Sequence, residues 1–257
     1  MNVRVYRNIY SMLNTKEDIP VVRRQFNYPE ETLYSILGQK IVRRTKKDFY
    51  VIKRQSHYLL RDWKKGKSLL EISREKHFSP ILLGTFILTE YGLTRREIRE
   101  FLANPSSIRD ERMKREVDEI LEEDIVYSPA AYEIQRRNGK NAEDAIAQWL
   151  REQNIRFTHE LERRNIHTKT PDFLFEKYMM LGTVRIRWIE SKASFGDKLQ
   201  MKMDYKKQLI HYLDMFGRGL VVYWNGYLND GTLRIAYHPL DRKIYITNQS
   251  FFGGRNG

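Results

Sequence analysis

The chain of 257 residues has no cysteine. This absence excludes disulfide bridges, thiolate zinc sites and a cysteine nucleophile, so a metal ion would need oxygen or imidazole ligands. Long hydrophobic runs are also missing. No stretch approaches the ~20 apolar residues that cross a bilayer, and Arg4, Arg7 and Asn8 interrupt the N-terminal apolar run that a signal peptide needs. We expect an intracellular protein with no membrane partner, cytoplasmic in a prokaryote and nuclear in a eukaryote.

Acidic residues are outnumbered by basic ones. The 46 Lys and Arg against 33 Asp and Glu give a net charge of +13 and a pI near 9.7. This excess favours a polyanionic partner, either nucleic acid or an anionic membrane face, and charge alone does not choose between them. Hydrophobic residues make up 41% of the chain, enough for one large core or two modest ones.

The first half of the chain has a helical pattern up to about residue 124. Ser68 can cap a helix over 69–76, and Ser79-Pro80 opens a second helix that runs to about Tyr91. Two short helices across a tight turn are typical of a DNA-reading helix-turn-helix, and equally of an ordinary helical hairpin. A domain boundary is predicted at Tyr127-Ser128-Pro129, which divides the chain into a helical, helix-turn-helix-like domain 1–128 and a second domain 129–257.

The most cationic stretch lies between Lys40 and Lys67, with 11 Lys and Arg residues against Asp48 and Asp62. A cluster of this kind on a helical domain is the electrostatic pattern of a nucleic-acid-binding surface. The residues predicted to contact nucleic acid, most of all DNA, come from this stretch and from a predicted third helix: Arg43, Arg44, Lys46, Lys47, Lys53, Arg54, Lys64, Lys65, Arg95 and Arg96.

After Pro129 the pattern changes to mixed α/β. Leu220 to Trp224 is a continuous apolar run, typical of a strand covered on both faces. The other predicted elements are helices over 141–152 and 199–216 and strands over 155–159, 172–180, 184–193 and 232–237.

Two short motifs in this half carry the chemistry. Pro171-Asp172 precedes Glu190-Ser191-Lys192, with 190 − 172 = 18 positions between the two acids. If the two strands pair antiparallel across Leu181-Gly182-Thr183, Asp172 lies opposite Lys192 with Glu190 diagonal to it. Mg²⁺ or Mn²⁺ held by Asp172, Glu190 and the main-chain carbonyl of Ser191 would offset the repulsion between the acids, and Lys192 would orient or deprotonate a water. A solvated hairpin with ordinary surface charges stays open.

Longer strings in this region resemble one known family, the TPD-motif family of the codanin-interacting nucleases. The strings are Thr170 to Phe173, the ten residues Trp188 to Asp197, Gln208-x-x-x-Tyr212 and Phe216 to Gly226. The resemblance is close in the C-terminal half and looser before it. It implies a restriction-endonuclease-like PD-(D/E)xK α/β fold, a mixed sheet flanked by helices, placed near archaeal Holliday-junction resolvases. The basic, cysteine-free composition is similar to that of an archaeal member.

The resemblance also implies further site residues. Gly139-x-x-x-Glu143 lies where these nucleases carry a helical acid, so Glu143 is the candidate third metal ligand, or a helix N-terminal Glu favoured by the macrodipole. Gln208 and Tyr212 share one helical face and either support the active site or are a core-facing pair. Asp197, like Ser194, matches the family string without an assignable role.

Three functions remain in view. The first is an Mg²⁺- or Mn²⁺-dependent deoxyribonuclease, specific for branched DNA such as a Holliday junction, and a homodimer by analogy with resolvases. The second is a nucleic-acid-binding regulator on a nuclease scaffold. The third is an adaptor for a protein partner, as the pairing of the animal relative with codanin suggests. The complete set Asp172, Glu190 and Lys192 favours the enzyme.

Overall fold

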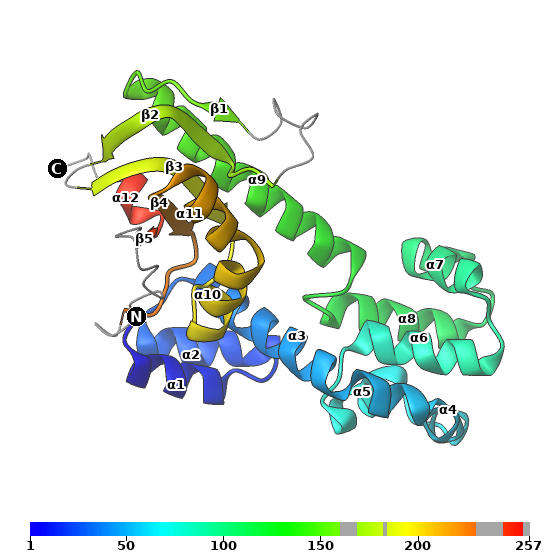
Figure 1. Cartoon of the computed structure of the whole chain (residues 1–257). Coiled ribbons are helices and arrows are strands. Elements are labelled where there is room, and N and C mark those ends of the chain that lie inside the picture. Colours follow the sequence, from blue (N-terminus) through cyan, green and yellow to red (C-terminus); the bar gives the residue numbers. More distant parts are fainter. Residues whose placement is uncertain (160–168, 182–183, 230–243, 254–257) are drawn as a thin grey trace. The chain divides into compact units, whose positions relative to one another are not determined.

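The computed structural model of the chain describes residues 1–159, 169–181, 184–229 and 244–253 (Figure 1). Its contacts group into two compact units. The sheet unit comprises Met1–Met12, Val22–Ser35 and Arg137–Gly257, and the helical unit comprises Leu13–Val21 and Ile36–Arg136. The units therefore differ from the predicted division at 128 and 129, because two N-terminal segments group with the C-terminal half.

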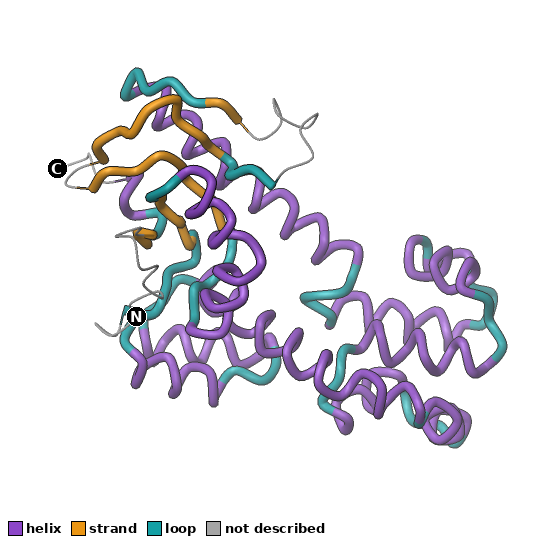
Figure 2. The backbone as a smooth tube through the Cα atoms, in the orientation of Figure 1, coloured by secondary structure: helices purple, strands orange, loops and turns teal. Residues whose placement is uncertain are grey.

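The helical unit contains helices and loops, and the strands drawn in Figure 2 belong to the sheet unit. Three described helices cross from one unit to the other along the chain: α2 (Ile19–Phe26), α3 (Glu30–Arg54) and α9 (Pro129–Glu152). The remaining elements of the helical unit are η1 (Lys16–Asp18), α4 (Ser56–Lys64), α5 (Leu69–Lys76), α6 (Pro80–Tyr91), α7 (Arg95–Ala103), η2 (Pro105–Ser107) and α8 (Glu111–Glu123). The predicted caps are confirmed: the Ser68 and Ser79 side chains accept from the Glu71 and Leu82 amides.

Helix α6 forms the centre of the helical core. Ile81, Leu83, Phe86, Ile87 and Leu88 are all buried, and the helix carries no Lys or Arg. A recognition helix must offer polar side chains to a DNA groove, which a buried apolar helix cannot do. The structure therefore favours the ordinary helical hairpin for α5 and α6.

The described part of the sheet unit holds a five-stranded mixed sheet in the order β1-β2-β3-β4-β5. Its strands are β1 (Thr158–His159), β2 (Phe173–Leu181), β3 (Val184–Lys192), β4 (Gly219–Tyr223) and β5 (Ile244–Thr247). The pairs β1–β2 and β2–β3 are antiparallel, whereas β3–β4 and β4–β5 are parallel. The predicted α/β class with a mixed sheet is confirmed, and the predicted strand 232–237 lies outside the described residues.

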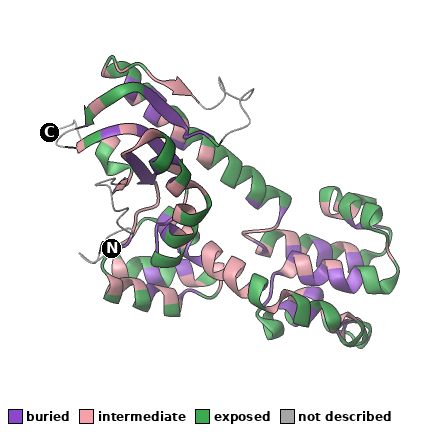
Figure 3. Ribbon diagram, in the orientation of Figure 1, coloured by how far each residue is buried: buried purple, intermediate pink, exposed green. Residues whose placement is uncertain are grey.

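Helices cover both faces of the sheet (Figure 1). On one face, Ile146 and Leu150 of α9 pack against strand residues that include Phe173. On the other face pack α10 (Lys198–Asp204), the π-helical turn η4 (Tyr205–Leu209) and α11 (Ile210–Phe216). Every residue of β4 is buried, as the apolar run predicted (Figure 3). Gly219 is required at the start of β4, because a Cβ there would lie 2.0 Å from the Trp188 indole.

A β-bulge sets the register of the β2–β3 hairpin. Near the turn Leu181 pairs with Val184, but between Leu174 and Met179 strand β2 advances five residues while β3 advances two, from Trp188 to Ile186. The bulge thus brings Asp172 level with Glu190. The predicted register, with Asp172 opposite Lys192, is wrong, because a bulge depends on tertiary packing that turn length alone does not reveal.

Helices α1 (Val3–Met12) and α12 (Ser250–Gly253) complete the described elements. Among the helices that the structure describes, none is both long enough and apolar enough to cross a bilayer.

Candidate active site

Two acidic side chains meet at the ends of β2 and β3. Asp172 is 9% exposed and Glu190 only 2%. The Ser191 amide donates to Asp172 Oδ2 at 2.7 Å, and the Asp172 amide lies 3.4 Å from Glu190 Oε2. The Ser191 side chain faces another direction, where its Oγ accepts from the Trp224 indole at 3.0 Å. The backbone of each strand thereby fixes the acid of the other.

The Lys192 amine lies between this acidic pair and the helical layer. Its Nζ donates to Glu190 Oε1 at 2.6 Å and to Gln208 Oε1 at 2.7 Å. Gln208 in turn donates to the Tyr212 hydroxyl at 2.6 Å, and that hydroxyl donates to the Thr170 carbonyl at 2.7 Å. Five of the six predicted catalytic residues, Asp172, Glu190, Lys192, Gln208 and Tyr212, therefore belong to one hydrogen-bonded network.

The helical side of the network includes a π-helical turn. Gln208 lies in η4, whose wider backbone spacing interrupts the regular α-helix between α10 and α11. Single π-turns of this kind are frequent at functional sites, because they redirect one side chain without ending the helix. Here the redirected face carries the amide that contacts Lys192.

The raised pKa values of Glu190 and Lys192 show that this site favours bound positive charge. Burial, followed by the neighbouring Asp172 charge, raises the pKa of Glu190 to about 8. Burial lowers the pKa of Lys192, but the charge and hydrogen bond of Glu190 outweigh it, so the net pKa is raised. Glu190 and Lys192 therefore each retain a proton more strongly than in water, because both pKa values are raised, which is the pattern of a functional site.

Glu143, the third predicted carboxylate ligand, lies beside His159. Its Oε2 lies 3.8 Å from Nε2 of His159, whose ring packs edge-on against Phe173. Within the part of the chain that the structure describes, no group of three or more His, Asp and Glu side chains is arranged to hold a metal. The structure thus brings Asp172 and Glu190 together and does not add Glu143 to them.

The two acids that do meet fit a hard divalent cation. Mg²⁺ is commonly bound by one or two carboxylates, with waters and substrate phosphates completing its shell. Asp172 and Glu190 supply that number of carboxylates, and burial followed by the Asp172 charge makes ionised Glu190 unfavourable, a cost that a cation would offset. Asp172 and Glu190 are therefore the residues able to hold such an ion.

Sequence reasoning missed an acid beside this network, Asp204. Its carboxylate accepts from the Tyr223 hydroxyl and from the Gln200 amide, each at 2.9 Å, and its charge contributes to the raised pKa of Lys192. Burial raises the pKa of Asp204 itself. The spacing of Asp204, Gln208 and Tyr212, four residues apart each time, was the available signal.

Asp197, which had no role in the sequence analysis, is a structural residue. It is 2% exposed, and its Oδ1 accepts from the Gln200 amide as the N-cap of α10. Its Oδ2 accepts from the Tyr6 hydroxyl at 2.6 Å, so it also attaches α1 (Val3–Met12) to the loop that follows β3. Phe195 of the same loop stacks on the Tyr6 ring.

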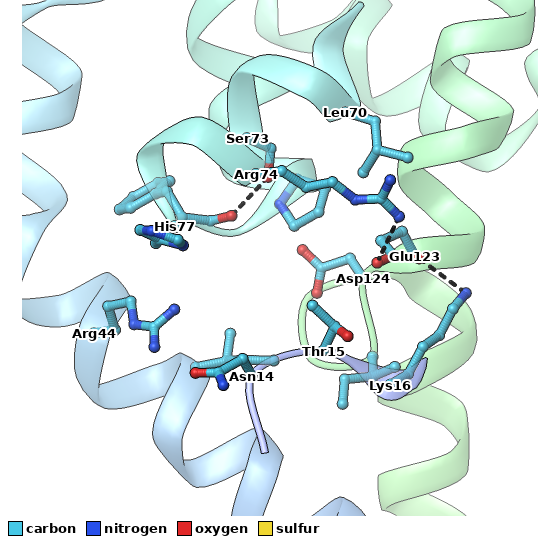
Figure 4. A pocket seen from close by; sticks show the side chains of 14 residues that line it. Asn14, Thr15, Lys16, Arg44, Leu70, Ser73, Arg74, His77, Glu123 and Asp124 are labelled. Atoms are coloured by element: carbon cyan, nitrogen blue, oxygen red, sulfur yellow. Dashed lines mark hydrogen bonds and ion pairs between the residues drawn. The ribbon is translucent and has the colours of Figure 1, made fainter. Parts of the chain in front are cut away.

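The predicted nucleic-acid contacts all lie in the helical unit. Eight of the ten are exposed, whereas Arg43 and Arg44 are half-buried. Arg44 lines a pocket of about 280 Å³ that also includes Arg74 and His77 (Figure 4). Glu123 in this pocket pairs with Lys16 at 3.1 Å and with Arg74 at 3.4 Å. Lining residues come from positions 14–125, so the pocket is separate from the Lys192 network.

Comparison with known proteins identifies relatives. A family profile described as "Protein of unknown function TPD sequence-motif" matches residues 109–249. Proteins named CDAN1-interacting nuclease 1 are similar over most of the chain. The Xenopus laevis protein is 31% identical, covering 78% of this chain and 72% of its own length. The Bos taurus protein is 29% identical, with 91% and 92% covered, and the Homo sapiens protein 28% identical, with 86% and 85% covered. No solved structure matches.

The matched segment contains the whole hydrogen-bonded network around Lys192 and spans more than half of the chain. The relatives extend the similarity into the N-terminal helices. The chain belongs to the TPD-motif family.

Proposed function

We propose that this chain is an Mg²⁺- or Mn²⁺-dependent nuclease of the PD-(D/E)xK type that hydrolyses phosphodiester bonds of DNA. The observation that carries the proposal is the Lys192 amine held at 2.6 Å from Glu190 and 2.7 Å from Gln208, beside the second acid Asp172. The relatives named as nucleases support it, as does the basic composition.

The chemistry follows from the residues around the acidic pair. Asp172 and Glu190 would hold the divalent ion, which supplies charge neutralisation and an acidified water when bound. The Lys192 ammonium is positioned to stabilise negative charge that develops on the phosphate. Gln208 holds that amine, and Tyr212 holds Gln208, so the amine keeps its position without relying on Glu190 alone.

The proposal is tested with the purified full chain on labelled linear, flapped and four-way DNA, with Mg²⁺ or Mn²⁺. We expect cleavage that Asp172→Asn and Lys192→Ala each reduce by at least about a hundredfold while DNA binding persists. EDTA should stop the reaction of the parent chain. Absence of any cut that depends on these two residues would leave a binding protein only.

The same panel addresses substrate and assembly. We propose that branched DNA is preferred and that a homodimer makes paired cuts on a two-fold junction. A mass measurement in solution, with and without a four-way junction, tests the dimer. Equal rates on linear and branched DNA by a monomer would contradict both proposals.

A second proposed role is binding to a protein partner, because the relatives carry the name CDAN1-interacting. We propose that this activity coexists with cleavage. The test captures the Asp172→Asn chain from a lysate of its native cells, with and without nuclease treatment, and identifies the proteins that remain bound. A partner retained after nucleic acid is removed supports a direct protein contact, and no retained protein contradicts it.

A further inference from the structure

We infer that the outer face of α4, together with the end of α6, is a stacking surface for single-stranded nucleic acid. The surface consists of Tyr58, Arg61, Lys64 and Tyr91, and we call it the tyrosine face. The inference rests on the proposed nucleic-acid substrate. It places the single-stranded part of that substrate on the helical unit.

The tyrosine face is directed away from the helical core. In α4 the buried residues are Leu59 and Trp63. With about 100° between successive residues of a helix, Tyr58, Arg61 and Lys64 fall on the opposite side. Tyr58 is 51% exposed and both cations are exposed, so core packing does not explain why an aromatic ring stands there.

Cations and rings alternate along this face. The Arg61 guanidinium lies 5.3 Å from the centre of the Tyr58 ring, and the Lys64 amine lies 5.9 Å from that of Tyr91. Tyr91, at the end of α6, is 47% exposed and rests edge-on against Trp63, which joins the two helices. The six residue steps from Tyr58 to Lys64 span about 9 Å along the helix axis, close to three base steps of about 3.4 Å.

The chemistry of this alternation fits a single strand better than a duplex. Exposed rings stack on unpaired bases regardless of sequence, and cations between them neutralise the phosphates. The bases of a duplex are already stacked on one another and offer no free face to a protein ring. Although Asp62 and Glu90 lie next in sequence, Lys65 adds to the two cations and keeps this region positively charged.

The test measures binding in EDTA, so that cleavage plays no part. Fluorescence anisotropy is recorded for a labelled oligothymidylate, the matching oligouridylate and a blunt DNA duplex of equal length. The double variant Tyr58→Ala, Tyr91→Ala should bind single strands about tenfold or more weakly, with duplex affinity changed by less than about twofold. The DNA and RNA arms show which sugar the surface accepts.

Matched variants separate stacking from folding. Tyr132→Ala removes another exposed tyrosine of the helical unit and should leave all affinities unchanged. Tyr58→Phe keeps the ring and should bind as the parent does. The inference is overturned if the double variant binds single strands as tightly as the parent, if it loses duplex equally, or if the parent binds neither oligonucleotide. If the double variant loses single-strand binding as expected but the parent never cuts DNA, this inference holds and the nuclease proposal fails.

Discussion

Glu116 of the helical unit and Glu190 of the sheet unit are equally buried acids with different surroundings. In the helical unit, Glu116 is 2% exposed and is surrounded by donors: the Trp63 indole, the Leu69 amide and the Arg112 guanidinium. In the sheet unit, Glu190 is equally buried but lies next to a second acid, and its pKa is raised. A buried acid with enough donors stabilises a fold, whereas one placed beside a like charge costs stability and indicates a functional role.

Asp124 extends the comparison. It is 3% exposed, and its two oxygens accept from the Ser79 hydroxyl and from three backbone amides, those of Ile81, Val126 and Tyr127. These contacts attach α6 to the segment after α8. Glu116 and Asp124 therefore connect elements of the helical unit, as Asp197 does in the sheet unit, whereas Asp172 and Glu190 lie side by side.

The largest expected effect on stability comes from Glu116→Ala. It would leave Trp63, Leu69 and Arg112 without their common acceptor, so we expect a loss of about 3–5 kcal/mol in the free energy of unfolding. Urea unfolding measures it. The control is Glu119→Ala in the same helix, where Glu119 makes only a surface ion pair with Arg115 at 3.9 Å. It should lower the free energy of unfolding by less than about 0.5 kcal/mol. Equal losses in both variants would refute a connecting role for Glu116.

The attachment of α1 gives the next effect. Tyr6→Phe removes the hydroxyl that donates to the buried Asp197 carboxylate, which should cost about 1.5–3 kcal/mol. Thermal unfolding is the readout, with Tyr34→Phe as the control because that ring is 43% exposed. A parental melting temperature for Tyr6→Phe would show that the hydroxyl bond to Asp197 does not stabilise the attachment of α1.

Glu190→Gln should act in the opposite direction. Because the folded-state pKa of Glu190 is raised, ionisation of this acid destabilises the fold. The parent should therefore lose stability relative to the variant as the pH rises from 4.5 to about 8, reaching about 1–2 kcal/mol. Unfolding in EDTA across this range tests it. A variant less stable than the parent at pH 8 would mean that Glu190 serves as a connector like Glu116.

The smallest effect concerns the hydrogen bond from Lys192 to Gln208. Gln208→Ala removes one of the two acceptors of the amine while Glu190 remains, so we expect the cleavage rate to fall by about tenfold with KM little changed. Gln148→Ala, on the exposed side of α9, is the control. If Gln208→Ala raises KM and leaves kcat intact, Gln208 contacts substrate and does not position Lys192.

Much of the fold was predictable because its signals are local. Helix caps at Ser68 and Ser79, the Leu220 to Trp224 run and the change of pattern after Pro129 all depend on neighbours in sequence. The candidate site was reached in the same way, since Asp172, Glu190 and Lys192 stand in short, specific strings. Glu143 was assigned from the resemblance and its distance along the chain, and it stays a prediction.

The sequence by itself determined which segments form helices and strands, and it supplied the candidates Asp172, Glu190 and Lys192. Only the tertiary structure decided that Asp172 lies level with Glu190, that Asp204 lies beside the network, and that residues 1–12 and 22–35 group with the sheet. The physical reason is range: a cap or an alternating strand is set within a few residues, whereas the Tyr6–Asp197 bond joins groups 191 positions apart. Such contacts form only once the core has packed.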